Sequence, residues 1–188
     1  QLSEEYERRF AMRWVGMYGF NDTFGIAVRR EIAEQYDLHT YSDLRRVAPQ
    51  LVFGAEYDFF ERADGYPALC KAYGLDFGRT VDLDIGLKYQ ALANKQIDVM
   101  IVFTTDGQLA AADARVLTDD RSFFPSYRCG NVVRAEVLER HPELVPVLEK
   151  LTDSITDEEM AAMNYAVESE GKEPHAVAEE FLRGKGIV

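Results

Sequence analysis

The stretch Ile97-Asp98-Val99-Met100-Ile101-Val102-Phe103-Thr104-Thr105-Asp106-Gly107 decides the fold class of this chain. Apart from Asp98, its first seven residues are apolar, which predicts a strand buried on both faces. The strand stops at a polar turn whose Gly107 tolerates unusual backbone angles. In an open α/β sheet, ligands bind beyond the carboxyl ends of the strands. Phe103 is therefore either a core residue at a strand end or a residue that meets a ligand.

Strands alternate with helices around this stretch. Strands are predicted at 12–15, 51–55, 80–84 and 114–117. Helices are predicted at Leu2–Phe10, at Gly25–Tyr36, after a Ser42-Asp43 cap, at Tyr66–Tyr73 before Gly74, and at Leu87–Asn94. This alternation predicts an α/β fold with a mostly parallel sheet covered on both faces.

The chain after residue 134 reads as three helices, at about 141–151, 157–168 and 174–185. Their apolar stripes need another surface to bury against. The helix Leu2–Phe10 starts without a cap and opens directly into a strand, so we expect an N-terminal part of this fold to be absent from the sequence.

Composition narrows the class of partner. The chain has 188 residues, 47% of them hydrophobic, and a formal net charge of -12. The negative charge argues against nucleic acid as a partner, because phosphates bind Lys and Arg, and it weakly favours cationic ligands. We find no zinc-like spacing of the two cysteines and three histidines, so no metal site is predicted.

Enzyme chemistry finds no support in the motifs. There is no G-x-S-x-G, H-E-x-x-H, P-loop or G-x-G-x-x-G pattern, so no nucleophile with a base is visible. Asp106 is either a general base on its turn or a turn-former that bonds its own backbone.

An aromatic residue instead recurs beside a polar turn. Phe24 follows Asn21-Asp22-Thr23, Phe103 precedes Thr104-Thr105, and Tyr127 follows Phe123-Phe124-Pro125-Ser126. Aromatic faces gathered around one point hold a quaternary ammonium ion, because the ring faces are negative and that cation is weakly hydrated. The alternative is three unrelated core aromatics, in a chain with 12% aromatic residues.

Five motifs in order resemble the extracytoplasmic substrate-binding proteins of ABC importers for osmoprotectants. They are Gly19-Phe20-Asn21-Asp22-Thr23-Phe24, Phe60-Glu61-Arg62-Ala63-Asp64-Gly65-Tyr66, Phe103-Thr104-Thr105-Asp106-Gly107, Phe123-Phe124-Pro125-Ser126-Tyr127, and Ile155–Met160 with Val177–Leu182. The match covers essentially the whole chain.

The resemblance implies a periplasmic-binding-protein-like fold of two α/β lobes that close on a ligand. Residues 1–10 would be the remnant of an N-terminal lobe helix, and 11–120 one full α/β lobe. Residues 121–188 would be the hinge return and the C-terminal helical part of the first lobe. Family members are longer at the N-terminus, which agrees with the capless start.

The resemblance also implies roles for individual residues. Phe24, Phe103 and Tyr127 look like cage aromatics, with Asp22 beside the quaternary ammonium. Arg62 looks like the residue that grips the ligand carboxylate, since a guanidinium donates two parallel bonds; a surface salt bridge is the alternative. Supporting residues are Asn21, Thr23, Thr104, and Asp64, which would orient Arg62 or the Gly65 turn. The first two cage positions are commonly Tyr in the family and are Phe here.

The leading hypothesis is a non-enzymatic binding protein without a cofactor. It would capture glycine betaine, proline betaine, choline or carnitine and deliver it to ABC transporter permease subunits. Its place would be extracytoplasmic: in the periplasm, or at the cell surface through a lipid anchor or permease fusion. The alternative is a truncated or domain-swapped assembly module, in which a homo-oligomer forms through the incomplete lobe and ligand binding is lost or shared.

Overall fold

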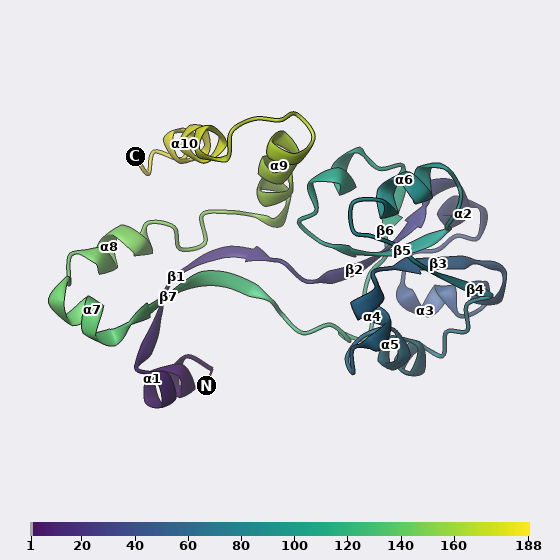
Figure 1. Ribbon diagram of the computed structural model, residues 1–188, viewed down its shortest axis with the longest axis horizontal. Helices are drawn as coiled ribbons and strands as arrows, with labels where there is room; N and C mark the ends of the chain where they lie inside the picture. Colours follow the sequence, from purple (N-terminus) through teal and green to yellow (C-terminus); the bar gives the residue numbers. More distant parts are fainter. Residues whose placement is uncertain (1) are drawn as a thin grey trace. The chain divides into compact units, whose positions relative to one another are not determined.

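The computed structural model describes residues 2–188, with side chains from residue 3. The chain forms two compact units: unit 1 is Gln1–Asp22 with Ser126–Val188, and unit 2 is Thr23–Pro125. Two connections therefore cross between the units, at residues 22–23 and 125–126 (Figure 1). These bounds differ from the expected lobe of 11–120, because the first strand pairs within unit 1.

Unit 2 is built on one mixed sheet with the strand order β4-β3-β5-β2-β6. Its strands are β2 (Phe24–Arg29), β3 (Val52–Ala55), β4 (Arg79–Asp82), β5 (Val99–Phe103) and β6 (Ala114–Val116). β3 runs parallel to β4 and β5, whereas β2 runs antiparallel to β5 and β6. The α/β class is confirmed, but the expectation of a mostly parallel sheet is wrong on the β2 side.

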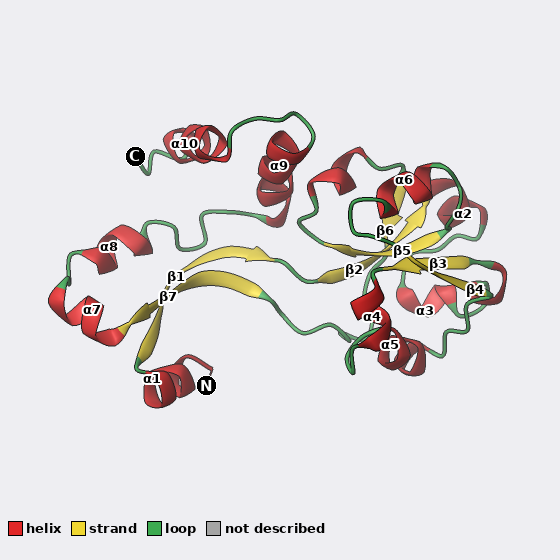
Figure 2. Cartoon of the chain, viewed as in Figure 1, coloured by secondary structure: helices red, strands yellow, loops and turns green. Residues whose placement is uncertain are grey.

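Short helices surround this sheet (Figure 2). They are α2 (Arg30–Gln35), α3 (Tyr41–Leu44), α4 (Tyr57–Glu61), α5 (Tyr66–Tyr73) and α6 (Lys88–Ala93), with 3-10 turns η1 (Ala48–Gln50) and η2 (Gly107–Ala111). The predicted end of α5 at Gly74 is confirmed: Gly74 adopts the left-handed conformation with φ 65°.

Two local predictions in unit 2 are wrong. The predicted helix Gly25–Tyr36 is β2 followed by α2, because the apolar run of β2 pairs with β5 along its whole length. The N-cap of α3 is Thr40 rather than Ser42-Asp43. Thr40 and Asp43 form a capping box, in which each side chain accepts from the other residue's backbone N–H.

The core of unit 2 lies on both faces of β5, as predicted. Val99 and Ile101 belong to one buried cluster, while Met100 and Val102 belong to the other. This alternation follows from the two-residue period of a strand. The neighbouring strand β2 divides in the same way, with Ile26 in the first cluster and Ala27 in the second.

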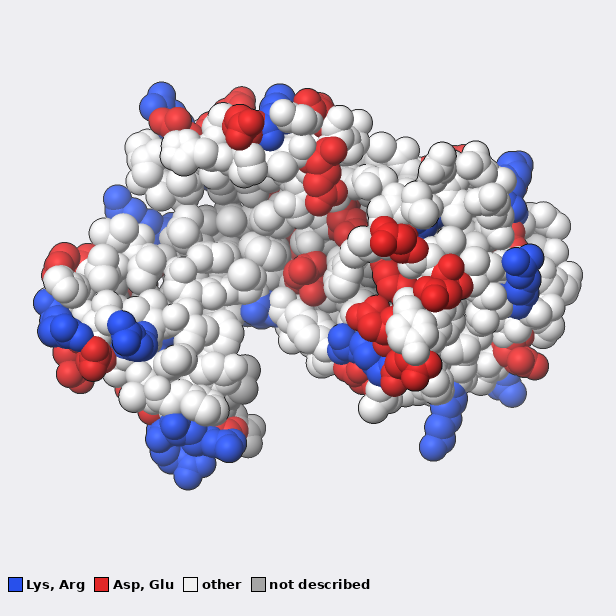
Figure 3. Space-filling view, viewed as in Figure 1, with Lys and Arg blue, Asp and Glu red and all other residues white. Residues whose placement is uncertain are grey.

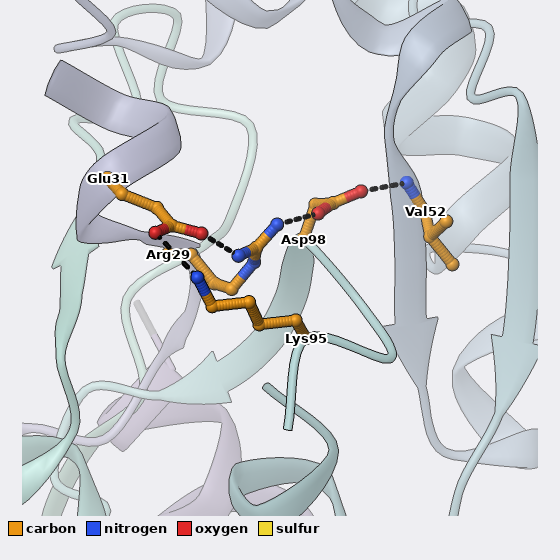
Figure 4. A network of polar contacts seen from close by, with 5 residues as sticks. All are labelled: Arg29, Glu31, Val52, Lys95 and Asp98. Carbon is orange, nitrogen blue, oxygen red and sulfur yellow. Dashed lines mark hydrogen bonds and ion pairs between the residues drawn. The ribbon is translucent and has the colours of Figure 1, made fainter. Parts of the chain in front are cut away.

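A polar network fastens the sheet at the start of β5 (Figure 4). Asp98 pairs with Arg29 at the end of β2, and its Oδ2 accepts from the backbone N–H of Val52 on β3 at 2.8 Å. Arg29 also pairs with Glu31, which bonds Lys95 at 2.8 Å. The Arg29 and Asp98 side chains are only 12% and 14% exposed, so Asp98 links the end of β2 and the start of β3 at a site with little access of water.

Unit 1 is a two-stranded antiparallel ribbon with helices. The ribbon consists of β1 (Met12–Asn21) and β7 (Arg128–Arg134). The helices are α1 (Leu2–Phe10), α7 (Ala135–Arg140), α8 (Leu144–Glu149), α9 (Asp157–Glu168) and α10 (Pro174–Gly184). The prediction of α9 is confirmed, and that of α10 to within one residue. The predicted helix 141–151 begins later and is preceded by the separate helix α7.

Glycines of β1 allow close approach of α8 and of the segment that follows it. A Cβ at Gly16, where φ is +65°, would lie 2.3 Å from the carbonyl oxygen of Leu148. At Gly19, where φ is +116°, it would lie 2.7 Å from that of Ile155. The same segment donates from the Ile155 N–H to the Tyr18 carbonyl at 3.0 Å. Within residues 2–188, no helix has the length and apolar character needed to cross a membrane.

Candidate functional site

Two predicted site residues, Phe24 and Phe103, are cross-strand neighbours in unit 2. They face each other in the antiparallel register of β2 and β5, and their ring centroids are 4.8 Å apart at 31°. Directly opposed residues project on the same face of a sheet, which explains why the rings meet. Thr104 donates its N–H to the Thr23 carbonyl at 2.9 Å, and the Thr23 N–H donates to Thr104 Oγ1 at 3.2 Å. These bonds fix the strand ends that carry the rings.

Further rings surround this pair. Phe59 of α4 and Phe124 have centroids 5.4 Å and 5.5 Å from that of Phe24. The spacing of Phe24 and Phe103 is too small for a trimethylammonium group to enter between them. A cation can therefore meet this cluster only from outside the pair, where a ring face attracts a cation within about 6 Å of its centroid.

Arg62 follows α4 and reaches the Phe24 ring. Its Cζ lies 5.3 Å from the ring centroid, and its side chain is 38% exposed. Nε and Nη2 each donate to one carboxylate oxygen of Asp64 at 2.9 Å. These hydrogen bonds hold the pKa of the Asp64 carboxyl below its ordinary value. Arg62 thus makes the surface ion pair considered as its alternative role, and its guanidinium lies beside the aromatic pair.

The turn after α4 fixes this arrangement. The Gly65 N–H donates to the Arg62 carbonyl at 3.1 Å. A Cβ at Gly65 would lie 2.1 Å from the carbonyl oxygen of Phe59, so only glycine fits at this position. Since the turn brings residues 62 and 64 together, the ion pair is a local consequence of the backbone.

The structure adds a buried cation, Lys88, which sequence reasoning missed. Its side chain is 1% exposed, and Nζ lies 3.0 Å from Glu56 Oε1, 3.3 Å from Asp106 Oδ2 and 5.5 Å from the Phe103 ring centroid. Asp106 also accepts from the Tyr89 hydroxyl at 2.8 Å and from the Phe103 N–H at 3.2 Å. Asp106 is therefore a turn-former and not a free base. The network joins the segments that follow β3 and β5 to the start of α6.

The remaining predicted residues belong to unit 1. The Asp22 N–H donates to the Tyr127 carbonyl at 3.1 Å, and the Tyr127 N–H donates to Asn21 Oδ1 at 2.6 Å. The Tyr127 side chain is 40% exposed. In unit 2, Thr23 Oγ1 donates to the Pro125 carbonyl at 3.1 Å. Each unit therefore ties its own ends of the two connections together. The predicted set divides into Asn21, Asp22 and Tyr127 in unit 1 and the other six residues in unit 2.

Charge on unit 2 favours a cationic ligand. Carboxylate side chains gather on its visible face over α4 and the neighbouring loops (Figure 3). The net charge of the whole chain is -12. Long-range attraction raises the local concentration of cations near such a surface. Among residues 2–188, no group of three or more His, Cys, Asp or Glu side chains could hold a metal ion.

The mixed sheet, the two adjacent connections and the aromatic edge define a small-molecule-binding protein of the periplasmic-binding-protein type. The chain belongs to the OpuAC family, the substrate-binding domain of ABC-type glycine betaine transport systems, whose model matches residues 1–184. The resemblance drawn from the five motifs is thereby confirmed. This family binds substrates for import and is not enzymatic, in agreement with the sequence analysis.

Relatives of the chain bind several ligands. It is 42% identical to the ergothioneine transport permease/ergothioneine binding protein EgtU of Helicobacter pylori, covering 99% of this chain and 34% of that protein. It is 40% identical to the carnitine transport binding protein OpuCC of Listeria monocytogenes, over 97% of this chain and 59% of that protein. The chain thus spans between a third and three fifths of these relatives.

A solved structure shares this fold closely. The crystal structure of a glycine betaine/carnitine/choline ABC transporter superposes with a TM-score of 0.90 at 39% identity, covering 98% of this chain and 68% of that chain. Apo YehZ from Escherichia coli superposes with a TM-score of 0.79 at 28% identity, covering 100% of this chain and 70% of that one.

Proposed function

We propose that this protein binds a small quaternary ammonium compound and delivers it to the permease of an ABC importer. The observation that carries the proposal is the Phe24–Phe103 ring pair with the Arg62 guanidinium beside it. Glycine betaine, carnitine and ergothioneine, the ligands in the relatives' names, each combine a trimethylammonium group with a carboxylate. Aromatic rings suit the first group and a guanidinium suits the second.

The trimethylammonium group and the carboxylate of the ligand bind to different side chains of the protein. Each desolvated ring face contributes about 0.5–2 kcal/mol to binding of the ammonium group. Arg62 donates charge-assisted hydrogen bonds to the carboxylate, which choline lacks. Asp22 and Tyr127, which the sequence analysis also predicts as ligand contacts, belong to unit 1 and remain predictions. The protein acts outside the cytoplasm, with permease subunits as partners, in keeping with its family.

Unit 1 favours a second candidate, an assembly module. Of the described hydrophobic side chains of unit 1, only those of Val15, Phe20 and Leu138 are buried. The apolar sides of its helices can be covered by further parts of the same lobe, as the longer relatives suggest, or by a second copy. Light scattering after size-exclusion chromatography separates the two: a monomer of the full chain that binds ligand argues against the module.

Calorimetry on the full chain with glycine betaine, carnitine, ergothioneine and choline tests the proposed function. We expect saturable binding of at least one of them. Phe103→Ala should weaken every ligand that binds, because each carries the ammonium group. Arg62→Ala should weaken the three carboxylate ligands far more than choline. Arg45→Ala, an exposed arginine of the α3–η1 segment, is the matched control and should change neither. Flat isotherms for all four compounds would refute the proposal.

A further inference from the structure

The Arg62–Asp64 pair occupies one of the two edges through which the Arg62 guanidinium can bind a carboxylate. Arg62 directs Nε and Nη2, one complete edge of its guanidinium, to the two oxygens of Asp64 at 2.9 Å each. A carboxylate binds a guanidinium best through two parallel bonds of this kind. Asp64 therefore makes, within the chain, the contact that the proposed ligand would make with Arg62.

Arg62 has contacts besides Asp64 that help to position it. Its guanidinium also lies over the Phe24 ring, with Cζ 5.3 Å from the centroid. The backbone of the turn is closed by the Gly65 N–H on the Arg62 carbonyl and by the close packing of Gly65 against Phe59. The Phe24 ring and the Gly65 turn give Arg62 contacts besides Asp64. We therefore take occupation of the Nε–Nη2 edge, and not orientation of Arg62, as the main effect of the Asp64 carboxylate.

The pair is also easily opened. The side chains of Arg62 and Asp64 are 38% and 57% exposed, so water screens their attraction. While the pair is closed, its two charges cancel, and a ligand carboxylate arriving at Arg62 meets the negative charge of Asp64. A carboxylate ligand that binds the Nε–Nη2 edge must displace Asp64, whereas a ligand without a carboxylate does not.

We propose that Asp64 is an internal competitor for Arg62 and thereby sets the preference between carboxylate-bearing and carboxylate-free quaternary ammonium ligands. The inference rests on the proposed function and deepens it. It differs from the orienting role that the family resemblance gives to Asp64, and the two roles predict opposite signs. Removing a competitor strengthens binding of a carboxylate ligand, while removing an orienting residue weakens it.

Calorimetry on the full chain at low ionic strength, with glycine betaine and choline as probes, tests this sign. For Asp64→Asn we expect the dissociation constant of glycine betaine to fall by about threefold to fivefold, the upper part of the range that follows from an exposed ion pair. The dissociation constant of choline should change by less than about twofold. Glu61→Gln removes the same charge from an exposed neighbouring side chain and should shift neither ligand by more than twofold.

The same substitution in an Arg62→Ala chain tests whether Asp64 affects ligand binding through Arg62. There, Asp64→Asn should leave glycine betaine affinity unchanged, because the competition needs the guanidinium. Weaker or unchanged glycine betaine binding by Asp64→Asn alone overturns the inference and leaves the proposed function standing. An equal gain in the Arg62→Ala background, or with choline, overturns it as well. A wild-type chain that binds neither probe overturns it together with its premise.

Discussion

The two compact units differ sharply in how they bury their side chains. Unit 2 holds two clusters of buried residues, one on each face of a five-stranded sheet. Unit 1 has a two-stranded ribbon, and among its described residues only Val15, Phe20 and Leu138 are buried hydrophobics. Buried side-chain nitrogens without a hydrogen-bond partner occur in both units: Trp14 Nε1 and Asn131 Nδ2 in unit 1, and Arg29 Nε in unit 2. Unit 2 has what a stable domain requires, whereas unit 1 lacks a core of its own.

This difference indicates where stability resides. Burial of apolar surface is the dominant favourable contribution to folding, so the stability of unit 2 should be largely its own. Three or more strands with a hydrophobic face are needed for a sheet to be stable by itself, and the β1–β7 ribbon has two. We expect unit 1 to depend on contacts beyond those within it. The predictions below compare matched substitutions in or around the two units.

Phe53→Ala should have the largest effect. Phe53 is fully buried in β3, and its ring centroid lies 4.9 Å from that of Phe77 and 5.1 Å from that of Tyr66. We expect a loss of about 3–5 kcal/mol in the free energy of unfolding, because the packed rings around it leave a cavity. Phe20→Ala in unit 1 removes a ring that is 8% exposed but lies outside both clusters. It should cost about 2 kcal/mol, the transfer contribution alone. Equal losses in urea unfolding would contradict the comparison.

Lys88→Met should follow closely. Lys88 is 1% exposed and pairs with Glu56 and Asp106, so its loss leaves two carboxylates facing each other in a poorly solvated site. We expect a destabilisation of about 3 kcal/mol, as for the broken buried pairs of other proteins. Lys95→Met removes a 63% exposed lysine from its pair with Glu31 and should cost less than about 1 kcal/mol. Denaturant unfolding of both variants provides the measurement. An unchanged free energy of unfolding for Lys88→Met would show that the Lys88 network does not stabilise the segments that follow β3 and β5.

The difference between these two lysines was beyond sequence analysis. Lys88 and Lys95 both stand in or beside one predicted amphipathic helix, and nothing in its spacing distinguishes them. Lys88 can be buried because its Nζ donates a hydrogen bond to Glu56, which follows β3 and lies 32 residues earlier in the chain. Such a contact follows from the strand order, which the sequence does not reveal.

Local patterns, by contrast, were informative. The apolar run before Phe103 predicted β5 and its burial on both faces, because the residues from Val99 to Val102 alternate between the two clusters. The family resemblance implied that Asp64 orients Arg62 or the Gly65 turn, and Asp64 does accept two hydrogen bonds from Arg62. The segment Gly25–Tyr36 was not predictable from its local pattern, because its helical spacing was overridden by pairing with a strand more than 70 residues later. A short apolar run is ambiguous between helix and strand until its partner is known.

Asp98→Asn should have an intermediate effect. The substitution removes the charge that pairs with Arg29, which is 12% exposed, while the amide oxygen can still accept from the Val52 N–H. We expect a loss of about 1–2 kcal/mol, near the contribution of one hydrogen bond to a charged group. Asp113→Asn, whose 85% exposed carboxylate pairs with Arg30, is the control and should change stability by less than about 1 kcal/mol. If both substitutions cost the same in denaturant unfolding, the Asp98 network does not fasten the strands.

The smallest predicted effects distinguish the two units most directly, because the described residues form one capping box in each unit, at the start of α3 and of α9. Thr40 accepts from the Asp43 N–H at 3.3 Å in unit 2, and Thr156 accepts from the Glu159 N–H at 3.1 Å in unit 1. Thr40→Ala and Thr156→Ala should each cost about 1 kcal/mol, the usual contribution of an N-cap. If the units unfold separately, each substitution lowers the midpoint of one transition and leaves the other in place.

At low pH, protonation of Asp43 and Glu159 should weaken the hydrogen bonds that their carboxylates accept in the two capping boxes. Backbone N–H groups of His39 and Thr40 lower the pKa of Asp43, while Lys185 and the Thr156 N–H lower the pKa of Glu159. A lowered pKa in the folded state gives stabilisation that is present above the unfolded pKa and is lost as the pH falls through the folded value.

For the Thr40→Ala and Thr156→Ala variants, hydrogen exchange at neutral pH, followed separately for amides of α3 and α9, reports on each capping box independently. Faster exchange in both helices after either single substitution would mean that the two units unfold together.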